Sequence, residues 1–368
     1  MSPLLSISRR TRRTPFTDRV TAAGVTGYTV YNHMLLPTVF KSITEDYRHL
    51  KSAVQVWDVS CERQVEIRGP QAAELVQMLT PRDLSEMRIG QCRYIPIVDE
   101  TGGMLNDPVA VKLDEDRYWV SIADSDLLFW VKALALGFRM AVDVFEPDVS
   151  PLAIQGPLAD ELAARVFGDE VRKIRFFDFR TFTFNGAELA VARSGYSKQG
   201  GFEVYVEGGR HGEPLWDALF EAGRDLDVRA GCPNLIERIE AGLLSYGSDM
   251  TRANTPHECG LGRFCDTRLA IGCVGRDALL RVAREGPLKQ IRYLEIEGDP
   301  VPSCPEPWAV TVEGEPAGQI TSAAWSPDFE ANLAIGMIVR DWWDQGTKVL
   351  VHTPAGPRTA RIREKPWL

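Results

Sequence analysis

One segment of this 368-residue chain occurs twice, and the repeat limits the folds that the chain can adopt. Glu66–Leu79 and Ala153–Val166 each combine the end of an apolar strand, a Gly-Pro dipeptide and an amphipathic helical run. Proline is favoured in the first turn of a helix, so each copy predicts a strand, a tight turn and a helix. Hairpin-like sequence follows each copy, at Gly102–Val120 and Glu188–Val206. The repeat predicts two related α+β modules with a ligand site at their junction.

The rest of the chain adds a third domain to these two modules. From about Pro287 onward, short β segments alternate with glycine and proline, which is typical of a small β-barrel or sandwich. We therefore expect an α+β protein of three domains. The first module with the N-terminal segment spans 1–145, the second module spans 146–286, and a barrel-like domain spans 287–368.

Charge and composition exclude several classes of protein. The net charge of −9 argues against a nucleic-acid binder, because the basic residues cluster only at Arg9–Arg13. No apolar run follows that cluster, so we expect neither a secretory signal nor a membrane span, and the cluster is a surface arm or a clamp for an anionic ligand. Seven cysteines without a CxxC pair and five scattered histidines predict a reducing, cytoplasmic location and no metal site.

The stretch Arg193–Val206 is the strongest candidate for a binding platform. It begins as a glycine-bounded polar loop and ends as an alternating strand with Phe202, Val204 and Val206 on one face. Glu203 and Tyr205 then stand together on the other face, beside glycines that let backbone amides approach a ligand. The alternative is an ordinary hairpin strand with a solvated polar face.

Three further positions are candidates from the residues alone, each with a structural alternative. Asp107 precedes a proline and belongs at a strand start or edge, where it faces a cleft or serves as a turn carboxylate. Tyr31 lies in an aromatic and polar segment that is a ligand contact or a strand at the edge of the core. Arg238 flanks the apolar stripe of a helix capped by Asn234, and it reaches a ligand carboxylate or makes a surface ion pair.

Several motifs together resemble the glycine-cleavage T-protein superfamily of tetrahydrofolate-dependent enzymes. They are Val56–Ser60, Tyr94 followed by Gly102-Gly103, Ser194–Tyr196 with Gly201–Val204, Arg238–Gly242, and Ser322 with Ser326-Pro327. The resemblance covers nearly the whole chain and implies three domains around a folate-binding cleft. It places the pterin-binding carboxylate at Glu203, puts Tyr94 and Arg238 in the folate cleft, and gives Asp107 the task of orienting the folate.

Within that superfamily the chain is similar to the dimethylsulfoniopropionate demethylases. The similar segments are Arg12–Phe16, Tyr28–Asn32, Met34–Pro37, Gln55–Ser60, Ser121–Asp126, Ser197–Gly201 and Gly231–Asn234. Two departures stand out. Asn106-Asp107 replaces the acidic pair of T-proteins and Ile122-Ala123 replaces their Asn-Ala pair, which disfavours aminomethyl transfer. Tyr196 replaces the tryptophan typical of the demethylases, which weakens cation–π binding.

This resemblance implies methyl transfer from the sulfonium of dimethylsulfoniopropionate to tetrahydrofolate. Positioning and desolvation of the reactants should contribute more to catalysis than acid–base groups, because the leaving sulfur becomes neutral. Tyr196, Tyr205 and Tyr31 would hold the cation, and Lys198 with the Ser121 hydroxyl would hold the substrate carboxylate. The alternatives are aminomethyl transfer with a lipoyl-protein partner, demethylation of another sulfonium or betaine, and folate binding without catalysis. We expect no nucleic-acid or membrane partner, and a possible homodimer.

Overall fold

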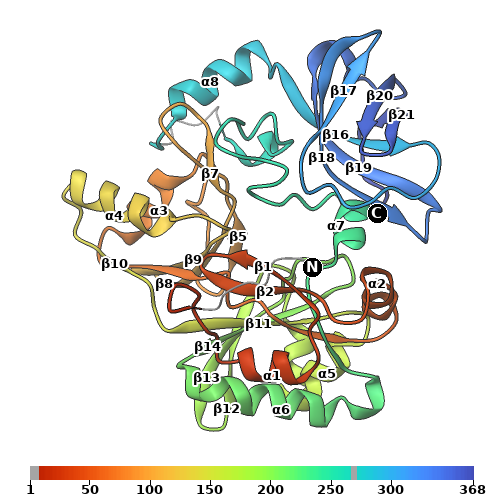
Figure 1. The fold of residues 1–368 in the computed structure, drawn as a ribbon. Helices are drawn as coiled ribbons and strands as arrows, with labels where there is room; N and C mark the ends of the chain where they lie inside the picture. The colour runs from red at the N-terminus through yellow and green to blue at the C-terminus, as the bar shows by residue number, and fades with distance from the viewer. Residues whose placement is uncertain (1–7, 267–271) are drawn as a thin grey trace.

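The computed structural model describes residues 8–266 and 272–368, and two larger sheets and a barrel organise them (Figure 1). The antiparallel five-stranded sheet has the order β10 (Asp143–Phe145), β4 (Gln64–Arg68), β9 (Arg117–Ser121), β8 (Val109–Asp114) and β5 (Cys92–Tyr94). The six-stranded sheet has the order β12 (Phe179–Phe184), β13 (Ala187–Ala192), β14 (Gly201–Glu207), β11 (Val149–Gln155), β3 (Gln55–Asp58) and β15 (Arg229–Gly231).

The C-terminal domain is a closed barrel, which confirms the prediction of a barrel-like third domain. Its strands follow the order β16 (Lys289–Ile296), β19 (Ala331–Val339), β18 (Glu315–Ser326), β17 (Trp308–Val312), β20 (Lys348–Thr353) and β21 (Gly356–Arg363). Two small hairpins complete the strands of the described chain: β1 (Gly27–Tyr31) with β2 (Met34–Val39), and β6 (Ile97–Val98) with β7 (Met104–Asn106). The helices are α1 (Thr17–Ala22), α2 (Ile43–Ser52), α3 (Ala72–Leu79), α4 (Leu127–Gly137), α5 (Ala159–Phe167), α6 (Gly212–Ala222), α7 (Leu235–Ala241) and α8 (Arg276–Glu285).

Both copies of the repeat form the predicted strand, glycine turn and helix, as β4 with α3 and β11 with α5. Gly69 and Gly156 link the two elements with φ of +136° and +127°, which side-chain-bearing residues rarely adopt. A Cβ atom at Gly69 would lie 2.6 Å from the carbonyl oxygen of Ala141, and one at Gly156 would lie 2.4 Å from that of Ala53. Each glycine therefore lets a neighbouring segment pass close to the turn.

Those neighbouring segments are exchanged between the two copies. β3 directly precedes β4 in the chain but pairs with β11, whereas β10 directly precedes β11 but pairs with β4. We call this arrangement the strand exchange. The predicted module boundary at residue 145 therefore does not separate the two sheets, because β3 precedes it in the chain but belongs to the sheet of the second copy.

The two larger sheets pack face to face, with helices on their outer sides. Apolar side chains of α3 and α4 pack on the five-stranded sheet, and those of α5 and α6 pack on the six-stranded sheet. Between the sheets lies a separate cluster in which the ring of Trp119 on β9 lies 5.6 Å from that of Tyr205 on β14. We call the faces that meet here the inner faces. The resulting α/β/β/α layers confirm an α+β architecture with helices on one side of each sheet.

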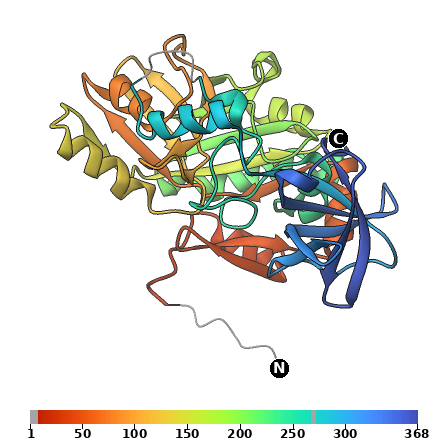
Figure 2. The ribbon, with the colours of Figure 1, turned by 90° about the horizontal axis from the view of Figure 1, so that it is seen from above.

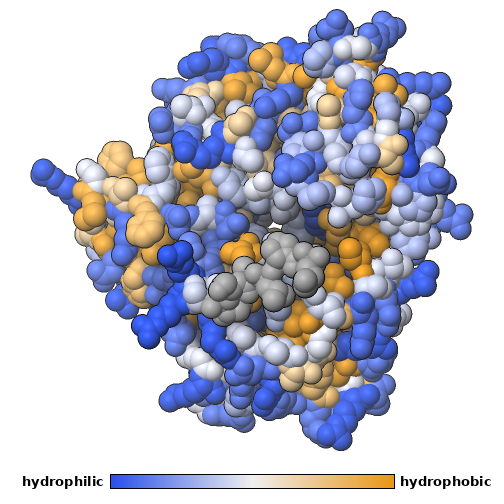
Figure 3. Space-filling model, viewed as in Figure 1, coloured by the Kyte–Doolittle hydropathy of each residue, from blue (hydrophilic) through white to orange (hydrophobic). Residues whose placement is uncertain are grey.

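Helix α8, at the C-terminal end of the second predicted module, packs against the first module. On α8, Leu279 is buried in one cluster with Val98 and Met104, and the view from above shows α8 beside the segments of the first module (Figure 2). By contrast, α4 projects from the molecule and exposes apolar side chains, including Phe129 and Leu136 (Figure 3). Within residues 8–266 and 272–368, no helix combines the length and apolarity needed to span a bilayer.

Candidate active site

Two buried asparagines tie together the segments that surround the candidate site. Asn32, in the turn between β1 and β2, donates from Nδ2 to the carbonyl oxygens of Cys61 (2.9 Å) and Ala123 (3.1 Å). Asn106, at the end of β7, donates to Ala123 O (3.0 Å) and Ser125 Oγ (2.8 Å) and accepts from Ala123 N (3.0 Å). The hairpin turn, the β3–β4 connection and the chain after β9 are therefore held at one point.

The residues beside this amide network carry the first group of site side chains. Tyr31 precedes Asn32, Glu62 follows Cys61, and Asp107 follows Asn106. Burial, and then the nearby carboxylates of Glu62 and Asp107, raise the pKa of the Tyr31 phenol well above its ordinary value. Three side chains from three separate segments thus converge.

Asp107 has one satisfied and one unsatisfied carboxylate oxygen. The Tyr94 hydroxyl donates to Oδ2 over 2.9 Å, while Oδ1 is buried and has no hydrogen-bond partner within the described residues. Burial raises the pKa of Asp107 to about 7, even though the bond from Tyr94 acts in the opposite direction. Tyr94 itself is held by an edge-on contact with Phe264 at 5.3 Å. The free Oδ1 can accept a hydrogen bond from a ligand.

The predicted alternation along β14 is confirmed. Phe202, Val204 and Val206 pack in the core under α5 and α6, so Glu203 and Tyr205 point from the inner face. Glu203 is 8% exposed and Tyr205 is 1% exposed, which excludes the alternative of a solvated hairpin strand. The Ser194 hydroxyl donates to Glu203 Oε2, and burial raises the pKa of Glu203.

Ser121 connects the two inner faces beside Tyr205. Its Oγ accepts a 2.9 Å bond from Gln64 Nε2 and lies near the Tyr205 phenol. Burial, followed by the charge of Glu203, raises the pKa of Tyr205 well above its ordinary value, and the bond with Ser121 lowers it only in part. The structure therefore brings Ser121, Tyr205 and Glu203 together, as predicted from the sequence for the last two.

Tyr196 closes another side of the site. Its hydroxyl donates to the carbonyl oxygen of Leu244 over 2.8 Å, and its ring packs against a cluster that contains Trp57. Burial raises the pKa of Tyr196, whereas the charge of Arg238 lowers it and the charges of Asp107 and Glu62 raise it. Tyr196 is thus fixed with its ring near the carboxylates and its hydroxyl occupied.

Arg238 and Lys198 are placed differently from the sequence expectation. Arg238 is buried and donates to Asp249 Oδ2 (2.8 Å) and to Ser322 Oγ (2.6 Å), so its guanidinium joins α7 to the barrel and is not free to clamp a ligand carboxylate. Lys198 is exposed, and its backbone nitrogen donates to Glu237 Oε1 over 2.7 Å. Within the described chain, no hydrogen bond or ion pair links Lys198 to Ser121.

Glu62 is a site residue that the sequence analysis missed. Burial, and then the charges of Glu203 and Asp107, raise its pKa well above the ordinary value. A partial signal was present in the sequence, because Glu62, Gln64 and Glu66 occupy every second position up to and along β4, although the residue between the first two is Arg63 and only Val65 and Ile67 are apolar. The charges of three carboxylates from different segments therefore act in one region.

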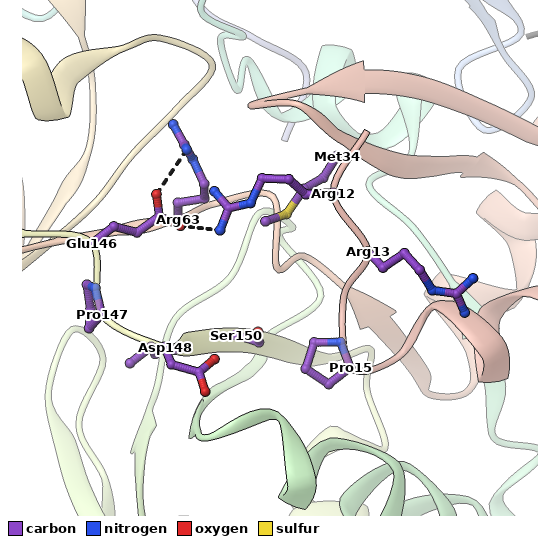
Figure 4. A pocket seen from close by; sticks show the side chains of 10 residues that line it. Arg12, Arg13, Pro15, Met34, Arg63, Glu146, Pro147, Asp148 and Ser150 are labelled. Atoms are coloured by element: carbon purple, nitrogen blue, oxygen red, sulfur yellow. Dashed lines mark hydrogen bonds and ion pairs between the residues drawn. The ribbon is translucent and has the colours of Figure 1, made fainter. Parts of the chain in front are cut away.

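The predicted basic cluster lines a cavity on the other side of this chain segment. Arg12 and Arg63 both contact Glu146, with Arg63 Nη1 at 3.0 Å from Oε2, at the edge of a cavity of about 390 Å³ (Figure 4). The residues that line this cavity include none of Glu62, Asp107 and Glu203. The cavity in Figure 4 is therefore separate from the carboxylate site.

The carboxylates, the phenols and the absence of basic partners define what this site can bind. The negative charges of Glu203 and Asp107 raise the free energy of the charged form of Glu62, and a bound cation would lower it. Within residues 8–266 and 272–368, no group of His, Cys, Asp or Glu is placed to hold a metal ion. An organic cation beside aromatic rings, or a hydrogen-bond donor, fits these groups.

Comparisons with known proteins agree with this architecture. Residues 16–268 match the GCVT N-terminal domain, and residues 289–368 match the glycine cleavage T-protein C-terminal barrel domain. The chain is 58% identical over 360 residues to dimethylsulfoniopropionate demethylase DmdA of Ruegeria pomeroyi, covering 98% of both chains. It is 30% identical over 344 residues to an aminomethyltransferase of Symbiobacterium thermophilum, covering 90% of this chain and 91% of that one.

A solved structure gives the same fold. The crystal structure of glycine cleavage system aminomethyltransferase T from Bartonella henselae matches with a TM-score of 0.85 at 22% sequence identity, covering 96% of this chain and 97% of that one. The two domain matches together span both modules and the barrel, and they confirm the resemblance drawn from the sequence motifs. The chain belongs to the glycine-cleavage T-protein family.

Proposed function

We propose that this protein transfers a methyl group from dimethylsulfoniopropionate to tetrahydrofolate, giving methylthiopropionate and 5-methyltetrahydrofolate. The observation that carries the proposal is the 58% identity, over 98% of both chains, to a dimethylsulfoniopropionate demethylase. The aminomethyltransferases of Symbiobacterium thermophilum and Caldanaerobacter subterraneus are more distant, at 30% and 27% identity. The protein is thus an enzyme of the methyltransferase class.

The reaction moves one methyl group in line between two heteroatoms. The bond from the folate nitrogen to the methyl carbon forms while the carbon–sulfur bond breaks, and sulfur keeps the electron pair and becomes neutral. The nitrogen then gives up its proton to a base or to water. Because the leaving group needs no protonation, the protein contributes mainly by positioning the partners and excluding water.

Glu203 and Asp107 are the residues that we assign to the folate. Tetrahydrofolate supplies the nucleophilic nitrogen when bound. Glu203 has a second carboxylate oxygen with no hydrogen bond to any described residue, and Asp107 has its buried, unpartnered Oδ1. Both can accept from ring N–H groups, and such charge-assisted bonds orient a planar ligand. Asp107 would orient the folate, with Tyr94 fixing its carboxylate.

Tyr31, Tyr196 and Tyr205 are the residues that we assign to the sulfonium. Aromatic rings attract a cation without offering a competing nucleophile. The occupied hydroxyl of Tyr196 leaves its ring as the surface for the cation, in place of the tryptophan ring of the demethylases. We expect Tyr205→Phe to impair substrate use, because the Tyr205 hydroxyl lies among Glu203, Glu62 and Ser121. Lys198 with Ser121 remains our candidate for the substrate carboxylate.

One incubation tests the proposal against its alternatives. Purified protein is kept anaerobic with tetrahydrofolate and dimethylsulfoniopropionate, and both products are followed by mass. Methylthiopropionate and 5-methyltetrahydrofolate appearing in equal amounts would support methyl transfer. Binding of the folate without turnover would overturn the assigned methyl donor, and turnover of a betaine in its place would identify the other cationic donor. A parallel reaction with an aminomethylated lipoyl protein, yielding methylene-tetrahydrofolate, would indicate aminomethyl transfer.

Cytoplasmic location and a homodimer are the remaining parts of the proposal. Reduced folate and the cysteine content support the first. Cell fractionation and light scattering after size-exclusion chromatography measure the two properties.

A further inference from the structure

Glu62 stands at the end of a row of polar side chains whose other members have partners. On the inner face of β4, Glu66 accepts from Arg117 Nε (2.8 Å) and from Trp119 Nε1 (2.9 Å). Gln64, the next in the row, donates to Ser121 Oγ over 2.9 Å. The Glu62 carboxylate makes no hydrogen bond or ion pair with any residue in the described ranges. The carboxylate oxygens of Glu62 are therefore available to a ligand.

The backbone of Glu62 is fixed, so its carboxylate is not a mobile surface group. Its amide nitrogen donates to Val59 O over 2.9 Å, and its carbonyl oxygen accepts from Gln64 Nε2 over 2.8 Å. Asn32 holds the preceding carbonyl, that of Cys61, at 2.9 Å. Groups held in place in this way before the ligand arrives lose little entropy on binding.

The surroundings of Glu62 are anionic and aromatic. Its charge acts on the carboxyl group of Glu203 and on the phenols of Tyr31, Tyr196 and Tyr205. Asp107 adds a third carboxylate, with its buried Oδ1 unpartnered. This orphaned oxygen is a separate sign that a ligand completes the site.

The basic residues closest in the chain or in the site are turned to other partners. Arg63 pairs with Glu146 at the edge of the cavity shown in Figure 4. Arg238 pairs with Asp249. Within the described residues, neither arginine therefore pairs with Glu62, Asp107 or Glu203, and a cation from outside can serve as their partner.

We propose that Glu62 is the counter-charge of the cationic methyl donor and so determines that the enzyme accepts a sulfonium. The inference rests on the proposed function. Glu203 and Asp107 are assigned to the folate, which leaves Glu62, next to the Cys61 carbonyl that Asn32 holds beside Tyr31, for the sulfur. Its charge attracts the substrate and loses its partner when the methyl leaves, because the sulfur of the product is neutral. Glu62 thereby favours binding of the substrate over binding of the product.

A neutral isostere separates this role from a structural one. In 4-methylpentanoate a C–H group replaces the S⁺ of dimethylsulfoniopropionate, with the same branches and the same carboxylate. Dissociation constants of both compounds are measured by calorimetry on the whole protein with tetrahydrofolate present. For Glu62→Gln we expect the affinity for the sulfonium to fall about 10- to 100-fold, and the affinity for 4-methylpentanoate to stay the same or improve.

Controls distinguish a failure of this inference from a failure of the proposed function. Asp126→Asn removes the same charge from a side chain that is 66% exposed, and it should change neither affinity by more than about twofold. Equal losses of affinity for both compounds in Glu62→Gln, or no loss for the sulfonium, would overturn the role of Glu62. Wild-type protein that binds the sulfonium without demethylating it would overturn the proposed function, while the comparison of the two affinities would still decide the role of Glu62.

Discussion

Replacement of Asp107 by asparagine should stabilise the ligand-free protein at alkaline pH. Burial raises the pKa of Asp107 from 3.8 to about 7, so the folded protein keeps a proton that the unfolded chain releases above about pH 4. The unfolded state therefore binds fewer protons between these two values, and the free energy of unfolding falls as the pH rises through that window. Proton linkage gives a loss of about 2–3 kcal/mol between pH 5 and pH 8.

Asparagine removes this titration and introduces a cost that does not depend on pH. The Tyr94 hydroxyl can still donate to the side-chain oxygen, but the amide group then occupies the buried position of Oδ1 without a partner. An unsatisfied buried donor costs about 1–3 kcal/mol at any pH. The change in Tm of the variant relative to wild type should thus be more favourable at pH 8 than at pH 5, by about 3 °C for a chain of this size.

Scanning calorimetry of both proteins at pH 5 and pH 8 without folate measures this difference. Asp126→Asn, which alters an exposed carboxylate, serves as the control and should show the same change in Tm at both pH values. An equal change in Tm for Asp107→Asn at the two pH values would refute the conclusion that ionisation of the buried Asp107 destabilises the ligand-free protein. The same variant should bind folate more weakly, because an amide group replaces the acceptor Oδ1 that we assign to the folate. The residue that destabilises the ligand-free protein is then the one that the ligand needs.

Three further substitutions test the folate site, the strand exchange and the barrel contact. Glu203→Gln should weaken tetrahydrofolate binding about 10- to 100-fold by calorimetry, and an unchanged affinity would remove Glu203 from the folate site. Gly156→Ala would place a methyl group 2.4 Å from Ala53 O at a φ of +127°, so its Tm should drop by several degrees, and a wild-type Tm would contradict the geometry of the turn. Asp249→Asn leaves Arg238 buried without its counter-ion and should cost about 3–5 kcal/mol in urea unfolding, whereas a loss below about 1 kcal/mol would indicate that the pair is solvated.

The sequence predicted the repeat and its local structure but not the partners of the strands. A Gly-Pro turn before an amphipathic helix is a local signal, and both copies formed as expected at Gly69 and Gly156. The strand exchange is not local, because β3 and β10 each have a neighbour in the chain that would be an equally good partner. The exchange is seen in the strand pairing and in the close passage of Ala141 and Ala53 over the glycines, and both need the three-dimensional structure.

The predictions for the site succeeded where alternation set the direction of a side chain. Glu203 and Tyr205 share the inner face of β14, because period-two alternation is reliable when one face carries large apolar residues. The expectation for Arg238 failed because the barrel, distant in sequence, supplies Ser322 as a partner. Glu62 was missed because it lies in the connection before β4, where the polar spacing that continues at Gln64 and Glu66 only begins.

The strand exchange also fixes the geometry of the carboxylate site. The chain passes from the six-stranded to the five-stranded sheet through residues 59–63 and returns through residues 146–148, and Glu62 lies in the first crossing. Arg63 and Glu146 join the two crossings through a 3.0 Å ion pair. This pair and the pairing of β3 with β11 hold the backbone beside Glu62 in place relative to the six-stranded sheet. The position of the charge that we assign to substrate recognition is thus set by the pairing of the two sheets and not by a flexible loop, as a preorganised site requires.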